Sequence, residues 1–314
     1  KMHMYRVVRI IILVLPISAA ISAWAENTSD IFDVQKVTDN VYALVGPLGD
    51  RSPENLSNNA TYGVVITSEG VVLIDSGGTY QGAQRIHESI RSLTRMPVKI
   101  VINTNSQDHR WLGNDYFRRQ GARIITHRKT VEDQKTNLND RLIRLANTVG
   151  EKGLEGTQAA YADAVFEDTL DISLGDTSLQ LFYVGQAHTP ADVIVWLPGE
   201  KIMFSGDVVY TERMLSVRSY SNSGSWLKAF DTMAAFAPEY IVPGHGHVTV
   251  LDRAREDTYS YLRFLRETVA EFMESGGDIA DVGKLDQSKY SYLVNYEFLN
   301  GRNAQQVFQE LEWE

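Results

Sequence analysis

Asn103-Thr-Asn-Ser-Gln-Asp-His109 is the stretch that decides the fold, because it follows a strand pattern and ends in two residues of types that commonly bind metals. The preceding residues, 98–102, form a nearly continuous apolar run, which is typical of a strand buried on both faces. Rigid scaffolds present functional groups on loops that directly follow such strands. Three more segments have the same form, and they are Ala187–Asp192, Ser205–Asp207 and Val242–Gly246. The four segments together predict one shared site.

Each candidate side chain also has a structural explanation. Asp108 precedes a helical pattern and could cap that helix. His188 could be a hydrogen-bonded histidine of the core, and Asp207 could be a turn aspartate. His245 lies between two glycines, where an imidazole contributes little packing. The joint occurrence of these hard and borderline ligands favours a metal site, suited to zinc, manganese or iron.

Short β-branched runs alternate with helical patterns along the rest of the chain. Strands are predicted at 41–45, 62–66, 71–74, 98–102, 123–126, 170–174, 179–183, 193–197, 202–204 and 240–242. Helices are predicted at 81–92, 114–120, 129–147, 226–236, 253–274 and 304–313, with a loop-rich insertion at 148–168 that could serve as a lid. Two β-rich halves, each followed by helices, predict an α/β fold in which two sheets pack together under helices on both outer faces.

The composition and net charge limit the metal ligands and the partners that this chain can have. The chain has 314 residues, a net charge of −10 and no cysteine, so any metal must be held by His, Asp, Glu or amide groups. The negative charge disfavours nucleic acid and anionic membrane surfaces as partners. We therefore expect a small-molecule substrate, and we leave a homodimer open.

The first 25 residues have the order of a secretory signal peptide. A basic stretch ending at Arg9 is followed by an apolar run from Ile10 to Ile21 and then by Ala23-Trp-Ala25. The apolar run is too short to span a bilayer comfortably. We expect cleavage after Ala25, which moves the net charge from −10 to −13, and a periplasmic or secreted bacterial protein with a single domain at 26–314. Met4 is a candidate native start, which would make residues 1–3 an addition.

The order of the motifs resembles that of the metallo-β-lactamase superfamily. Leu73-Ile-Asp-Ser-Gly77 matches an early family segment, and the four segments above match, in order, His-x-His-x-Asp-His, Gly-His-Thr-Pro-Gly, Gly-Asp and Pro-Gly-His. The similarity runs from about residue 38 to 250. It implies a four-layer αβ/βα sandwich with the site on its rim. We expect Asp75 either to hold a ligand histidine by the far nitrogen of its ring or to cap the turn that follows it.

The first two histidines of the family motif are missing. Anchoring the motif on Asp108 and His109 puts Thr104 and Ser106 in their places, and sliding it by one residue offers Asn105 and Gln107 instead. The family's first metal site would then keep only His188 and the shared Asp207, which is too few ligands for tight binding. The second site keeps its ligands, and these are Asp108, His109, Asp207 and His245. The resemblance thus implies one metal ion per chain, with zinc expected and manganese or iron as alternatives.

Asp108-His-Arg-Trp-Leu-Gly113 resembles the corresponding segment of the mononuclear chlorothalonil dehalogenase type of this superfamily. This likeness implies a metal-dependent hydrolase, with hydrolytic dehalogenation of an aromatic compound as a candidate reaction, and the predicted signal peptide makes it an exported one. We assign the catalytic roles to Asp108 and His188, with His188 orienting the water or moving its proton. Aromatic and apolar side chains near the motifs are candidates for the substrate pocket, and they are Tyr80, Trp111, Tyr210, Met214 and Trp226.

Two alternatives remain. One is a β-lactamase, lactonase or thioesterase of the same fold, although such enzymes generally keep the histidines that Thr104 and Ser106 replace. The other is a non-catalytic relative that uses a degraded site for binding or as an accessory protein. Metal content separates the second alternative from an enzyme, because a binding module has no need of a stoichiometric ion.

Overall fold

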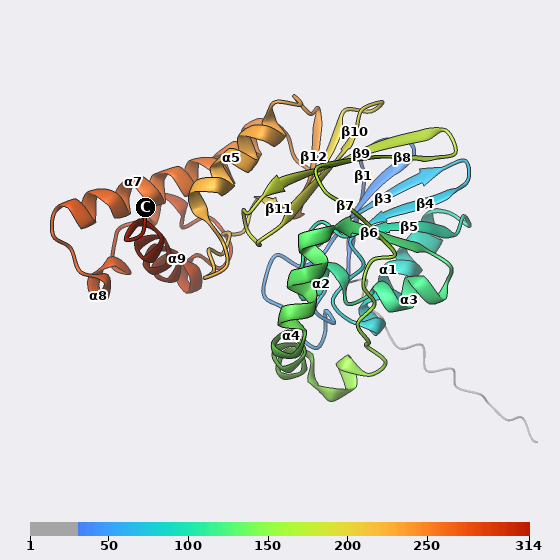
Figure 1. Ribbon diagram of the computed structural model, residues 1–314, viewed down its shortest axis with the longest axis horizontal. Coiled ribbons are helices and arrows are strands. Elements are labelled where there is room, and N and C mark those ends of the chain that lie inside the picture. The colour runs from blue at the N-terminus through green and yellow to red at the C-terminus, as the bar shows by residue number, and fades with distance from the viewer. Residues whose placement is uncertain (1–30) are drawn as a thin grey trace, which may run out of the picture. The chain divides into compact units, whose positions relative to one another are not determined.

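Two β-sheets packed face to face organise the computed structural model, which describes residues 31–314 (Figure 1). In that range the first sheet has seven strands in chain order: β1 (Asp33–Lys36), β2 (Val41–Val45), β3 (Thr61–Thr67), β4 (Gly70–Ile74), β5 (Val98–Ile102), β6 (Arg123–His127) and β7 (Ala164–Phe166). The second has five described strands in the order β12 (Tyr240–His245), β11 (Ile202–Tyr210), β10 (Asp192–Leu197), β9 (Thr177–Gly185) and β8 (Thr169–Leu174). The signal peptide predicted at 1–25 lies outside the described residues.

The core between the sheets is apolar on both sides. Val65 and Val72 of the first sheet share one buried cluster with Val195 and Phe204 of the second. Strands β4 to β7 pair in parallel, and so do β11 and β12, while the other neighbouring strands are antiparallel. Parallel strands bring their carboxyl ends to the same edge of a sheet, so the loops that follow them can meet there.

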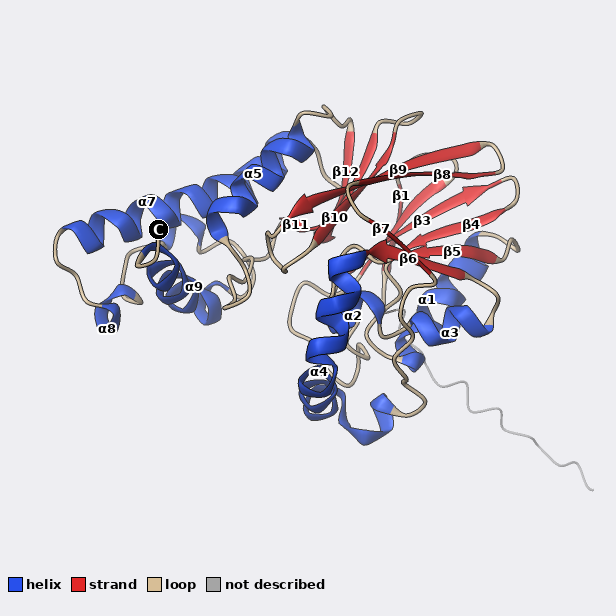
Figure 2. Cartoon of the chain, in the orientation of Figure 1, coloured by secondary structure: helices blue, strands red, loops and turns tan. Residues whose placement is uncertain are grey.

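Helices cover the outer faces of both sheets (Figure 2). The first sheet is covered by α1 (Tyr80–Leu93), α2 (Asp108–Trp111), α3 (Asn114–Arg119) and α4 (Arg128–Leu154). On the second sheet, α5 (Ser223–Ala234) packs on β9 and β11 and α6 (Leu251–Ala254) contacts β12, while α7 (Ser260–Glu274), α8 (Ile279–Val282) and α9 (Tyr296–Leu311) pack on α5 and on one another. This arrangement confirms the predicted α/β sandwich.

Helix α1 shows how the sequence specifies one of these layers. The Thr79 hydroxyl accepts a hydrogen bond from the Gly82 amide at 2.8 Å, which satisfies a free donor at the start of the helix. Ala83, Ile86 and Ile90 are fully buried and pack in a cluster with apolar residues of the first sheet. Their spacing of three and four residues places them on one face of the helix.

The predicted loop at 148–168 is wrong over two parts of its length. Helix α4 continues to Leu154 across Gly150, whose φ of 74° breaks the regular helix, and residues 164–166 form β7. Leu145 and Val149 pack under Trp111 and so hold this helix against the protein. Strand β11 is also longer than predicted, so Asp207 lies on a strand and not in a turn.

The predicted helix at 253–274 contains a π-helical turn at Arg255–Tyr259. Inside this turn the Thr258 hydroxyl donates to the Tyr210 carbonyl at 2.6 Å and accepts from the Tyr210 amide at 2.9 Å. The turn therefore fixes the end of β11. No helix in residues 31–314 combines the length and the apolar character that a membrane crossing requires.

At Gly63 of β3 the facing sheet leaves no room for a side chain. A Cβ atom there would lie 2.4 Å from the ring carbons of Phe204. We predict that Gly63→Ala lowers the free energy of unfolding by about 1–3 kcal/mol, because overpacking displaces the Phe204 ring. Gly199→Ala is the matched control, since its Cβ meets nothing within 4 Å, and it should change stability by less than about 0.5 kcal/mol. Equal urea midpoints for the two variants would contradict this account.

Candidate metal centre

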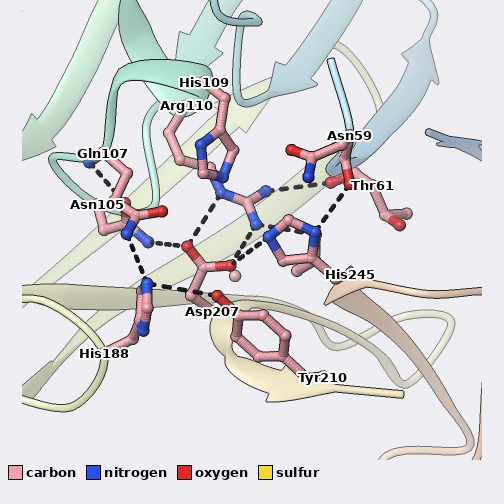
Figure 3. Close-up of polar contacts among 12 residues, drawn as sticks. Asn59, Thr61, Asn105, Gln107, His109, Arg110, His188, Asp207, Tyr210 and His245 are labelled. Carbon is pink, nitrogen blue, oxygen red and sulfur yellow. Dashed lines mark hydrogen bonds and ion pairs between the residues drawn. The ribbon is translucent and has the colours of Figure 1, made fainter. Parts of the chain in front are cut away.

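The four segments singled out in the sequence meet at one end of the sandwich. Asn105 and His109 follow β5, His188 follows β9, Asp207 lies in β11, and His245 is the last residue of β12. Their polar groups face one another around Asp207 (Figure 3). His109, His188 and His245 also line a cavity of about 370 Å³. The convergence expected from the strand ends is therefore present.

Three of the four predicted ligands form a tight group. One ligand atom each of His109, Asp207 and His245 lies within 4.8 Å of the others, and all three residues are buried. The His245 Nδ1 donates to the Asn59 carbonyl at 2.8 Å, which leaves its Nε2, 3.4 Å from Asp207, as the free nitrogen. The His109 Nε2 is buried without a hydrogen-bond partner among residues 31–314. Two imidazole nitrogens and a carboxylate match the protein ligands of a catalytic zinc site with an open position.

The charge states of these groups suit metal binding. Burial lowers the pKa of His109 to about 4 and that of His245 well below its usual value. Burial alone would raise the pKa of Asp207, but the adjacent Arg110 holds it well below its ordinary range. At neutral pH the group thus offers two neutral imidazoles and one carboxylate, the forms that bind a metal ion.

Asp108, the fourth predicted ligand, is engaged elsewhere. Its Oδ1 pairs with Arg51 at 2.5 Å, accepts from the His109 amide at 2.9 Å and lies 3.3 Å from the His109 Nδ1. Burial opposes ionisation of Asp108, but Arg51 and His109 hold its pKa well below its usual value. A carboxylate at Nδ1 fixes a histidine ring with Nε2 free. Asp108 is therefore placed to orient His109.

Arg110 is the residue on which this site is built, and the sequence analysis did not single it out. Its guanidinium is fully buried, pairs with Asp207, and donates to Asp75 at 3.0 Å and to the Gly244 carbonyl at 2.8 Å. Burial would lower the pKa of Arg110, but the two carboxylates raise it, so the guanidinium remains charged. Gly244 is required here, because a Cβ at this position would lie 2.5 Å from the Asp207 carboxylate.

Asp75 does not orient a histidine as the sequence had suggested. It accepts from the Thr104 amide at 2.7 Å, from the Thr104 hydroxyl at 2.8 Å and from Arg110. Burial raises the pKa of Asp75 to about 6, and Arg110 opposes that rise. The carboxylate thus holds the strand end and the buried guanidinium in place of a ligand ring.

Asn105 and Gln107 occupy the space beside the group of three. The Asn105 amide donates to the Asp207 Oδ2 at 2.8 Å, and the Gln107 amide lies 2.6 Å from the His188 Nε2. Thr104 instead binds Asp75, and Ser106 contacts Arg141 through its carbonyl and hydroxyl.

These contacts decide between the two alignments that the sequence left open. The alignment that puts Asn105 and Gln107 in the histidine positions agrees with the geometry. It also puts His109 in the family's aspartate position and Arg110 in that of the last histidine.

His188 faces the cavity as a neutral ring. Its Nε2 is 3.3 Å from the Tyr210 hydroxyl, and burial lowers the pKa of His188 to about 4. The Tyr210 ring stacks on His245 with a centroid distance of 4.6 Å. Tyr210 thus bridges the predicted water-handling residue and a predicted ligand.

The apolar candidates separate into two groups. Tyr210 and Met214 line the cavity, as does Thr148 from the insertion. Trp111 and Trp226 are fully buried in core clusters, and Tyr80 packs edge-on against Tyr116.

Two arginines, Arg51 and Arg213, also line the cavity. The sequence did not predict them as site residues, because no pattern near them connects them with the site.

Comparison with known proteins agrees with this architecture. The family model of the metallo-beta-lactamase superfamily matches residues 58–245, so the chain belongs to that superfamily. The type 2 metallo-beta-lactamase of Elizabethkingia meningoseptica is 24% identical over 229 residues, which cover 72% of this chain and 82% of that relative. The type 2 enzyme of Bacteroides fragilis is 26% identical over 222 residues, which cover 69% and 80%. The family and the His/Asp group together indicate a metal-dependent hydrolase.

Solved structures support the fold. A metallo-beta-lactamase from Pontibacter korlensis superposes with a TM-score of 0.59 at 22% identity, covering 74% of this chain and 99% of that one. The DIM-1 metallo-beta-lactamase gives a TM-score of 0.56 at 17% identity, with 73% and 95% covered. This chain thus covers nearly the whole length of both solved structures.

We predict that Arg110→Met destabilises the metal-free protein by about 3–5 kcal/mol, because it leaves two buried carboxylates without their cation. Chemical denaturation monitored by circular dichroism measures the effect. Arg119→Met is the control: Arg119 forms a surface pair with Asp115 at 2.9 Å, and losing such a pair costs at most about 1 kcal/mol. An Arg110→Met protein as stable as the control would show that the guanidinium does not hold the site together.

Proposed function

We propose that this chain is a hydrolase that depends on one metal ion, held by His109, Asp207 and His245. The observation that carries the proposal is the buried, unpartnered His109 Nε2, which lies in a group with Asp207 and His245 whose ligand atoms are within 4.8 Å. An ion held there would supply Lewis acidity and lower the pKa of a bound water to about 7. Zinc suits this donor set, and so does iron in a site of two histidines and one carboxylate.

A single ion follows from the chemistry of the neighbouring side chains. Where the family has imidazoles, Asn105 directs an amide N–H at Asp207 and Gln107 directs one at His188. Amide N–H groups are hydrogen-bond donors and are not metal ligands. We therefore assign Asn105 and Gln107 to hydrogen bonding and His188 to the substrate side of the cavity.

His188 is the residue that we assign to proton transfer. Its ring is neutral at pH 7, faces the cavity and lies within hydrogen-bonding distance of Gln107 and Tyr210. A neutral imidazole can accept a proton from water and pass it to a leaving group. The Tyr210 hydroxyl keeps its proton, because burial raises its pKa well above the usual value, and it can donate a hydrogen bond to a developing negative charge.

The bond that is cleaved has two candidate classes. The likeness of Asp108–Gly113 to the chlorothalonil dehalogenase type favours a carbon–halogen bond on an aromatic ring. The relatives from Elizabethkingia and Bacteroides are named as beta-lactamases, and this favours the amide of a β-lactam ring. A panel of a chlorinated aromatic nitrile, a β-lactam, a lactone and a thioester, each with and without chelator, tests the proposal. Chelator-insensitive turnover of every active substrate would overturn it.

Metal content gives a direct prediction. Purified protein loaded with zinc should hold one tightly bound ion per chain by elemental analysis. His109→Ala should abolish that binding, because it removes one of three ligands. Asp108→Asn should weaken binding by about 10–100-fold, as expected when a carboxylate that orients a ligand histidine is neutralised. Two tight ions per chain in the native protein would refute the single-ion assignment.

His188→Ala is the matched comparison. It should keep nearly full metal occupancy while turnover of any active substrate falls by roughly 100-fold or more. If the metal is lost as completely in His188→Ala as in His109→Ala, His188 is a ligand and the assignment of roles is wrong.

We also propose that the protein is exported, on the basic, apolar and Ala-x-Ala order of residues 1–25. Intact mass spectrometry of protein from the periplasm of a bacterial host should give a chain that begins at Glu26. Recovery of only uncleaved chain from the cytoplasm would contradict export.

A further inference from the structure

The cavity beside the metal centre is positively charged in a chain whose net charge is −10. Five arginines line it against two aspartates. The arginines are Arg51, Arg141, Arg144, Arg213 and Arg218, and the aspartates are Asp50 and Asp108. Such a local reversal of sign concentrates negative ligands in a cleft.

Arg213 is the inner cation of this cavity. Its exposure is only 8%, and its Nε is buried without a hydrogen-bond partner in the described chain. Its nearest carboxylate is Asp50 at 3.6 Å, which is 66% exposed to solvent. The carboxylate of Asp207 is already neutralised by Arg110. A buried guanidinium without a buried counter-ion is costly, so an anion bound beside Arg213 would remove that cost.

Arg144 and Arg218 are the outer cations. Both are exposed, and neither forms an ion pair with any residue in 31–314. By contrast, Arg51 pairs with Asp108 at 2.5 Å and Arg141 pairs with Asp133 at 2.6 Å. The cavity therefore has cations available at two depths, one in its floor and two nearer its mouth.

We propose that the cavity binds an organic substrate with two negative groups, one held by Arg213 and the other by Arg144 and Arg218. The proposal rests on the proposed hydrolase function, because the same cavity leads to the metal centre. The body of the substrate has apolar walls to contact, since Tyr220, Phe298 and Met214 also line the cavity. A carboxylate, sulfonate or phosphate group satisfies either position through charge-assisted hydrogen bonds to guanidinium.

Binding to metal-free protein tests the proposal without any hydrolysis. The protein is stripped with chelator, dialysed and titrated calorimetrically with benzene-1,3-dicarboxylate and pentanedioate, and with the monoanions benzoate and pentanoate. At low ionic strength each dianion should bind roughly tenfold or more tighter than its monoanion, since a second charged hydrogen bond adds about 1.5–3 kcal/mol. Raising the salt concentration should shrink this ratio.

Variants assign the two positions. Arg144→Gln/Arg218→Gln should reduce dianion affinity to the monoanion level and leave monoanion affinity within about twofold, because exposed charges that contact no ligand contribute little. Arg213→Gln should weaken both classes. Arg91→Gln/Arg95→Gln removes two exposed arginines that do not line the cavity, and it should bind every ligand as the native protein does.

The proposal is overturned if neither dianion binds more tightly than its monoanion, or if the Arg144→Gln/Arg218→Gln protein binds dianions as the native protein does. These outcomes leave the hydrolase proposal intact, because that proposal depends on metal content and chelator-sensitive turnover. Conversely, absence of a bound metal would refute the hydrolase and leave the charge-selective binding measurable.

Discussion

The buried ion-pair network of Arg110 with Asp75 and Asp207 is the interaction on which the rest of the site depends. These side chains come from α2, from the end of β4 and from β11, so a single guanidinium joins both sheets. Its remaining donors reach carbonyl groups of Thr61 and Gly244, so the buried charge is hydrogen-bonded on all sides. A buried pair of this kind contributes little net stability against an apolar alternative, but it is strongly destabilising when broken. Its main effect here is to fix where the Asp207 carboxylate lies.

The fixed carboxylate also keeps the His/Asp group together at a place where the family's first two histidines are absent. Asp207 receives Arg110 and Asn105 from one side and faces His109 and His245 on the other. The amides of Asn105 and Gln107 fill hydrogen-bonding positions that an apolar side chain would leave unsatisfied. The site thus stays polar where the family has imidazoles, and His109, Asp207 and His245 keep a close arrangement in which the His109 Nε2 is left free.

Much of this architecture could be predicted from sequence, and the failures have physical causes. Alternating and continuous apolar runs predicted the strands and the layers, because a strand buried on one face alternates apolar and polar residues and a strand buried on both faces is apolar throughout. The four segments at strand ends were correctly expected to meet. The contacts of Asp108 with Arg51 and of Asp75 with Arg110 were not anticipated, because these partners are brought together by tertiary contacts that no sequence spacing encodes. The offset of the histidine motif by one residue was undecidable for the same reason, since only the side-chain directions distinguish Thr104 from Asn105.

The His/Asp group and part of the cavity wall lie on different elements, and this separation affects how the protein can evolve. Asp207 and His245 lie on buried strands, whereas Arg141, Arg144 and Thr148 lie on one long helix that covers the first sheet and is broken at Gly150. Substitutions along that helix therefore change the wall of the cavity without replacing any residue of the His/Asp group. Surface elements tolerate sequence change far better than buried strands do. Selection can therefore vary the cavity wall through one helix while the buried His/Asp group stays as it is.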